Sequence, residues 1–212
     1  MTWRWPVTLH RRLPSGEQLT LRPLRRRDRA EFEALLTANA GWLRPWESTI
    51  PGAPGLSTPQ TRPPFHHLRR TTDRAARDGL LLPLVIEVDG RMVGQVQLFD
   101  LLWGARRTGW AGYWLAREET GRGYATWALA VLLDHALLDV GLHRVEVAIR
   151  PENTASLAVV GRLGLREEGL QRGLMHVDGG WRDHRSFVLL AEDLDEGRLV
   201  EGVTGGRPTT GP

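Results

Sequence analysis

Two glycines separated by one residue, Gly121 and Gly123, stand directly before the longest amphipathic stretch of the sequence. The first backbone N–H groups of a helix have no partner within the helix and lie at the positive end of its dipole. Glycine lets such a turn approach an anion without a Cβ in the way, and Arg122 could add a charge-assisted hydrogen bond. The pattern predicts a phosphate or diphosphate site, although two glycines before a helix can also form a simple tight turn.

Several other kinds of chemistry are excluded by the residue types. The 212 residues include no Cys, and all 28 basic residues are Arg. A cysteine nucleophile, thiolate metal ligands and Schiff-base chemistry on Lys are therefore excluded. The glycine turn lacks the Gly-Lys-Ser/Thr of a P-loop and the third Gly of a dinucleotide fingerprint. No HExxH-like pair of His is present, so we predict no metal site.

The charge pattern and the apolar runs also limit the partners. The arginines occur in short clusters, such as Arg25–Arg27, that are mixed with acidic residues, and the net charge is only +3. We therefore do not expect direct nucleic-acid binding. No apolar run is long enough to cross a bilayer, and the first residues do not have the pattern of a signal peptide. We expect a cytoplasmic protein that makes no membrane contact, as a monomer or a homodimer.

The glycine turn requires a strand before it and a helix after it. Residues 108–116 predict that strand, and residues 123–140 predict a helix whose apolar stripe stops at Gly141. A strand over 144–149 and a helix over 153–163, with Asn153 as its N-cap, should follow.

The rest of the chain supplies the surrounding elements. Residues 81–88 and 92–101 flank Asp89-Gly90 and predict a hairpin. The other expected elements are an edge strand at 18–24, helices at 27–38 and 65–78, a long loop at 39–64, and closing strands at 165–177 and 185–190. We predict an N-terminal arm (1–17), one domain (18–194) and a disordered tail (195–212). The expected fold is mixed α/β with a largely antiparallel sheet flanked by helices.

The run Gly112–Thr126 resembles motif A of the GCN5-related N-acetyltransferases, the GNAT family. Three further segments, Gly141–Glu146, Pro151–Leu157 and Gly180–His184, are similar to ribosomal-protein-alanine N-acetyltransferases of the RimJ/RimL type, as is Trp42–Glu47. The resemblance implies an acyltransferase fold whose central sheet is splayed beside the strand before motif A, where the pantetheine arm of acetyl-CoA enters.

Carried over position by position, the resemblance implies a set of cofactor contacts. Tyr113, Trp114 and Leu115 would line the pantetheine through their backbone, and Asn153 would face the cofactor near its thioester. The residues that would hold the pyrophosphate are Gly121, Arg122, Gly123, Tyr124, Ala125 and Thr126. The family usually begins this loop with Gln or Arg, whereas Thr120 stands here, but backbone amides can still serve.

The resemblance implies less about the catalytic side chains. The Tyr that many relatives use as the acid is replaced by Val160, and Ser156 would assist the leaving thiolate, or simply bond the backbone at a helix start. Glu146 would be the base, or else a solvated or Arg-paired strand carboxylate. Met175 stands where the RimL type carries an acid, so His176 next to it could substitute.

The activity implied is transfer of acetyl from acetyl-CoA, as co-substrate, to a primary amine by direct attack on the thioester. The acceptor would be a protein N-terminal α-amine, for example that of a ribosomal protein. The alternatives are a small-molecule amine or a non-catalytic acyl-CoA sensor. The loop 39–64 and the hairpin 92–109 would shape the acceptor cleft, and Glu47 could bind the incoming amine.

Overall fold

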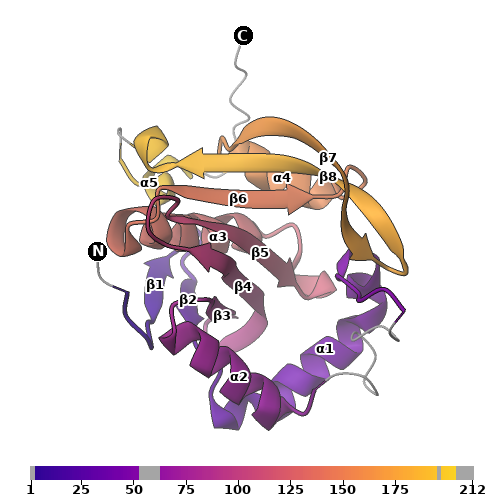
Figure 1. The fold of residues 1–212 in the computed structure, drawn as a ribbon. Helices are drawn as coiled ribbons and strands as arrows, with labels where there is room; N and C mark the ends of the chain where they lie inside the picture. Colours follow the sequence, from indigo (N-terminus) through magenta and orange to yellow (C-terminus); the bar gives the residue numbers. More distant parts are fainter. Residues whose placement is uncertain (1–2, 53–62, 195–196, 204–212) are drawn as a thin grey trace.

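The computed structural model describes residues 3–52, 63–194 and 197–203, and Figure 1 shows its ribbon. One eight-stranded sheet runs through this part of the chain in the order β1-β2-β3-β4-β5-β6-β8-β7. Its strands are β1 (Leu9–Arg12), β2 (Gln18–Arg22), β3 (Leu82–Val88), β4 (Arg91–Leu102), β5 (Thr108–Leu115), β6 (Arg144–Ile149), β7 (Arg166–Val177) and β8 (Gly180–Leu190). Neighbouring strands are antiparallel except β5 and β6, which are parallel. The predicted mixed α/β fold with a mostly antiparallel sheet is confirmed.

The helices cover both faces of the sheet (Figure 1). They are α1 (Arg29–Leu43), α2 (Phe65–Arg77), α3 (Tyr124–Asp134), α4 (Thr154–Arg162) and α5 (Leu199–Gly202), and a π-helical segment, His135–Val140, continues α3. One core packs α1 and α2 against Val85 of β3 and Met92 of β4. A larger core packs α3 and α4 against Leu84 and Ile86. Since β3 is buried on both faces, its sequence is an almost continuous apolar run. No helix in the described ranges is long and apolar enough to cross a membrane.

The sheet splits between its two parallel strands. β5 pairs with β6 only where Thr108–Trp110 lies beside Arg144–Glu146. Beyond these residues β5 continues to Leu115 and β6 to Ile149 without pairing to each other. Where β5 and β6 diverge, the backbone groups on their facing edges are not paired with each other and border a space between the two strands. This space is where the site lies.

Several predictions about the elements were wrong in detail. β2 is not an edge strand, because β1, from the predicted arm, pairs along it. α1 continues past residue 38 to Leu43, and β8 begins at Gly180 rather than at residue 185. The loop predicted at 39–64 is therefore shorter at its start, and its residues 53–62 lie outside the described residues.

The C-terminal prediction also needs correction. Leu199–Gly202 form α5 within the segment expected to be disordered, while residues 195–196 and 204–212 lie outside the described residues. α5 is held by the buried carboxylate of Asp134 in α3, which accepts from the N–H groups of Leu199 (2.8 Å) and Val200 (3.2 Å). This contact joins residues far apart in sequence, so local patterns could not reveal it.

Candidate active site

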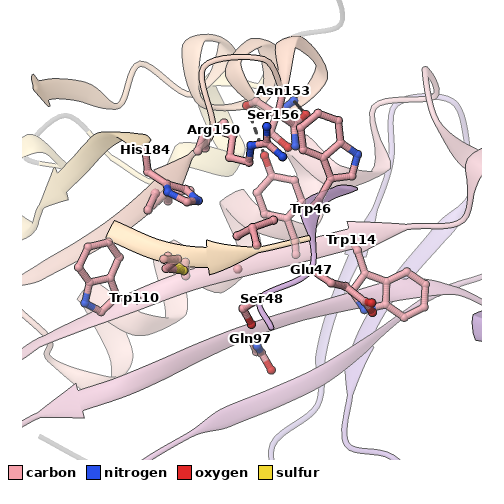
Figure 2. A pocket seen from close by; sticks show the side chains of 18 of the residues that line it. Trp46, Glu47, Ser48, Gln97, Trp110, Trp114, Arg150, Asn153, Ser156 and His184 are labelled. Carbon is pink, nitrogen blue, oxygen red and sulfur yellow. Dashed lines mark hydrogen bonds between the residues drawn. The ribbon is translucent and has the colours of Figure 1, made fainter. Parts of the chain in front are cut away.

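A pocket of about 300 Å³ lies where β5 and β6 diverge, and Figure 2 shows its lining. Its walls come from β4, β5, β6, β7, β8, α4 and the segment after α1. They include the predicted cofactor residues Tyr113, Trp114 and Asn153 and the predicted catalytic Ser156. Trp46 and Glu47 of the segment after α1 and Gln95 and Gln97 of β4 also line it, so both segments expected to shape the acceptor cleft reach this pocket. Gly121–Thr126 and Leu115 are not among the lining residues.

The glycine turn follows the outer end of β5 and opens α3. Gly121 and Gly123 have φ angles of +80° and +81°, a left-handed conformation that favours glycine. Gly123 is the N-cap of α3, and among the described residues no side chain caps this helix start. A Cβ at Gly121 would meet no atom within 4 Å, so the turn is open rather than filled by side chains.

The side chains around the turn are more constrained than the backbone. The buried Glu119 accepts from Arg91 (3.1 Å) and lies 3.5 Å from Arg122, so the Arg122 guanidinium is held toward a carboxylate. Thr126, in the first turn of α3, has a buried hydroxyl oxygen that finds no partner among the described residues. Tyr124 is buried and donates to Glu17 (3.1 Å). The turn thus offers mainly backbone N–H groups to a ligand.

Side chains of α1 fix the end of β5 that leads to this turn. Asn39 accepts from the N–H of Arg117 (2.8 Å), and the Trp42 indole donates to the carbonyl of Leu115 (3.2 Å). Leu115 is buried, and its carbonyl is already occupied. Of the three residues predicted to contact pantetheine, the structure therefore places only Tyr113 and Trp114 on the pocket wall.

The first turn of α4 forms one corner of the pocket. Asn153 caps it by accepting from the N–H of Ser156 (3.1 Å), as predicted for an N-cap. The Tyr113 hydroxyl donates to the Ser156 carbonyl (3.4 Å), and burial raises the pKa of Tyr113 to about 12, so this phenol stays protonated. Both backbone groups of Ser156 are thus bonded, and Ser156 is one of the residues that line the pocket.

The two predicted bases lie outside the pocket lining. Glu146 accepts from Arg144 (3.1 Å), as the Arg-paired alternative predicts, and it lies in the part of β6 that is still paired with β5, before the two strands diverge. The His176 ring bonds the Thr49 hydroxyl (2.7 Å) and packs edge-on against Trp181. Each side chain is thus bonded to a neighbour outside the pocket lining, and its role as a base stays a prediction.

A histidine that sequence reasoning passed over lies in the pocket. His184 of β8 is 5% exposed and lines the wall near Trp110 and Arg150 (Figure 2). Its neighbours Arg182 and Asp183 are exposed, so the strand turns this ring inward. The sequence carries no local signal for this burial, because Arg182, two residues earlier on the same strand, is exposed.

The arginine at the end of β6 attaches the segment that carries Trp46 and Glu47. Arg150 donates to the carbonyl of Pro45 (2.8 Å) and to Glu152 (3.2 Å), and its guanidinium lies 5.4 Å from the centre of the Trp46 ring. The contacts of Arg150 with Pro45 and Trp46 join the end of β6 to the segment after α1 across the mouth of the pocket. They give the pocket a wall that neither segment could form alone.

The comparisons with known proteins agree with this geometry. Residues 18–166 match the family described as "Acetyltransferase (GNAT) domain". The fold is also similar to that of RimJ from Mycobacterium smegmatis in complex with CoA-disulfide, with a TM-score of 0.85, 40% identity, and 94% of each chain covered. The splayed sheet and the glycine turn therefore define a member of the GNAT acetyltransferase family. The chain belongs to that family, as its resemblance to the RimJ/RimL type predicts.

Curated relatives are more distant. The [ribosomal protein uS5]-alanine N-acetyltransferase of Escherichia coli is 26% identical over 50% of this chain and 55% of its own length. The spermidine N(1)-acetyltransferase of Escherichia coli is 25% identical over 93% of this chain and 99% of its own length. Three N-acetyltransferases from Bacillus are 33% or 34% identical, and the matches span between 46% and 60% of their length.

Proposed function

We propose that this protein transfers the acetyl group of acetyl-CoA to the N-terminal α-amine of a protein substrate. The observation that carries the proposal is the course of β5. Its residues from Trp110 to Trp114 line the pocket at the split in the sheet, and its end leads through the short 3-10 helix Arg117–Glu119 into the open turn Gly121–Gly123. One strand therefore connects a place for the reacting thioester with a place for the diphosphate of the same cofactor.

The residues present fit acetyl-CoA. The N–H groups at the start of α3, which no side chain of the described ranges caps, suit a diphosphate. The hydroxyl of Thr126, also without a partner among those residues, lies in the first turn of the same helix. The pocket then receives the thioester, whose bound acetyl group is the electrophile. Tyr113 and Asn153 line the side of α4, where Ser156 could donate a hydrogen bond to the departing sulfur.

The reaction needs no covalent enzyme intermediate. The nitrogen lone pair attacks the thioester carbonyl carbon, the C–N bond forms, and the C–S bond breaks as CoA leaves as a thiolate. The nitrogen loses one proton to a base, and the sulfur gains one. An α-amine has a pKa of about 8, so a weak base is sufficient to deprotonate it.

The pocket and the relatives favour a peptide acceptor. Its lining contains Trp46, Trp110 and Trp114, and Glu47 is the one carboxylate among the described lining residues. A site for a polycation would be expected to present several carboxylates. The Escherichia coli relative that acts on alanine of ribosomal protein uS5 supports the same acceptor class.

The test is an acetyl-transfer assay that measures released CoA with a thiol reagent. The chain contains no Cys, so the enzyme contributes no thiol background. Peptides that begin with Ala or Ser should be acetylated, and the same peptides with a blocked α-amine should not. Mass spectrometry should place the acetyl group on the α-nitrogen.

A small-molecule acceptor is the alternative, because the spermidine N(1)-acetyltransferase aligns over almost its whole length. A higher kcat/KM for spermidine than for every peptide would replace the peptide proposal. Binding of CoA without transfer to any amine would instead indicate an acyl-CoA sensor.

A further inference from the structure

The pocket needs a group that takes a proton from the attacking amine, and both bases predicted from the sequence lie outside its lining. Among the described lining residues, Glu47 and His184 are the side chains that can accept a proton near neutral pH. They come from opposite walls, Glu47 from the segment after α1 and His184 from β8 (Figure 2). The contacts of each side chain indicate which of the two takes the proton and which binds the amine.

One hydrogen bond of the His184 ring determines which of its two nitrogens keeps a lone pair that can accept a proton. Its Nδ1 lies 3.0 Å from the carbonyl oxygen of Arg182. A carbonyl can only accept, so Nδ1 carries the hydrogen and Nε2 keeps its lone pair. The ring is therefore held in one tautomer and orientation by the backbone of its own strand.

The surroundings keep this ring neutral. Burial is the largest effect and lowers the pKa of His184, and the positive charge of Arg150 lowers it further. The bond to the Arg182 carbonyl, Glu152 and Asp183 act in the opposite direction and do not reverse it. At neutral pH the imidazole is thus an uncharged base in the wall of the pocket.

We propose that His184 Nε2 accepts the proton of the amine as it attacks the thioester. The inference rests on the proposed function, since it assumes that the pocket holds the acceptor. The nitrogen forms its bond to carbon, the C–S bond breaks, the proton moves from nitrogen to Nε2, and the resulting imidazolium later releases it to solvent. The sulfur takes its own proton from solvent or through the hydroxyl of Ser156, so the step balances.

This assignment also favours one class of amine. A neutral imidazole is a weak base, so it is better matched to an α-amine with a pKa of about 8 than to an alkyl amine near about 10.4. Glu47, half-buried at the opposite wall, can bind the ammonium form of the acceptor. That form first releases one proton to solvent, and His184 then takes the second proton as the neutral amine attacks. Loss of His184 should then lower kcat, whereas loss of the Glu47 charge should raise KM for the amine.

The experiment compares His184→Asn with Glu47→Gln. The Asn amide can still donate to the Arg182 carbonyl but cannot act as a base. We expect kcat with a saturating Ala-starting peptide to fall about 10²-fold or more in H184N. The acid limb of its kcat profile, measured with saturating peptide so that ionisation of the free amine does not contribute, should disappear, and CoA affinity should be unchanged. E47Q should raise KM for the peptide and keep the acid limb. A wild-type rate and pH profile in H184N, or loss of the limb in E47Q, would overturn the assignment.

A second measurement separates this inference from the acceptor proposal and does not depend on the variant folding. NMR titration of the wild-type imidazoles should show the His184 signal shifting when the Ala peptide or spermidine is added with CoA. If only spermidine is acetylated, the peptide proposal fails, and the variants tested with spermidine still decide the role of His184. A His184 signal that neither amine moves would refute it even if the enzyme is active.

Discussion

The glycine turn gives the most direct test of cofactor binding, through the pair Gly123→Glu and Gly123→Gln. Gly123 has φ +81°, so any side chain there adopts a left-handed conformation that costs about 1 kcal/mol. Glu and Gln have the same size and carry the same strain. Their difference in CoA affinity therefore isolates the charge placed against the diphosphate.

The magnitude follows from the position of the turn. Two unit charges 4 Å apart repel by about 4 kcal/mol at an effective dielectric constant of about 20. Gly123 is exposed, so solvent and salt reduce this repulsion to about 1.4 kcal/mol, which corresponds to about tenfold in Kd. We expect calorimetry to show CoA binding about tenfold weaker in G123E than in G123Q, with a smaller ratio at high salt.

Two controls complete the experiment. Pantetheine lacks the diphosphate and should bind both variants equally. Gly164 has φ +68° and no atom within 4 Å of a built Cβ, so Gly164→Gln carries a similar strain away from the turn. It should lower the free energy of unfolding by about 1 kcal/mol without changing CoA affinity. Equal CoA affinity in G123E and G123Q would refute the phosphate-binding role of the turn.

Three further predictions concern the pocket and the C-terminal helix. Ser156→Ala leaves both backbone hydrogen bonds intact, so kcat should fall about 10²-fold while the Kd of CoA stays constant; an unchanged kcat would mean that solvent protonates the thiolate. Asp134→Ala removes the acceptor of one buried and one part-buried N–H group, so the free energy of unfolding should fall by about 2 kcal/mol and the amides of α5 should exchange faster. Unchanged exchange would contradict the capping role. The pKa of His184 is lowered on folding, so the unfolded chain binds a proton that the folded chain does not. Stability in urea should therefore decrease as pH falls below about 6.5, more in the wild type than in H184N, and identical pH dependence would contradict the burial of this ring.

Elements with strong local patterns were predictable. The glycine turn, the helix stripe after it and the Asn153 cap all depend on residues within one or two turns of each other. β1 was missed because its four residues, Leu-His-Arg-Arg, are largely polar, and its pairing with β2 alone makes it a strand. α5 was missed because Asp134, more than sixty residues earlier in the chain, supplies its cap.

The sequence by itself determined that a strand, an open glycine turn and a helix follow one another, since backbone conformation and helix-end chemistry are local properties. Tertiary structure alone decided which side chains meet in the pocket. It brought Arg150, at the end of β6, to the carbonyl of Pro45 and turned His184 inward from β8, because strand register and the divergence of β5 from β6 set those directions. The chemistry of the site therefore depends on contacts between segments that no single stretch of sequence contains.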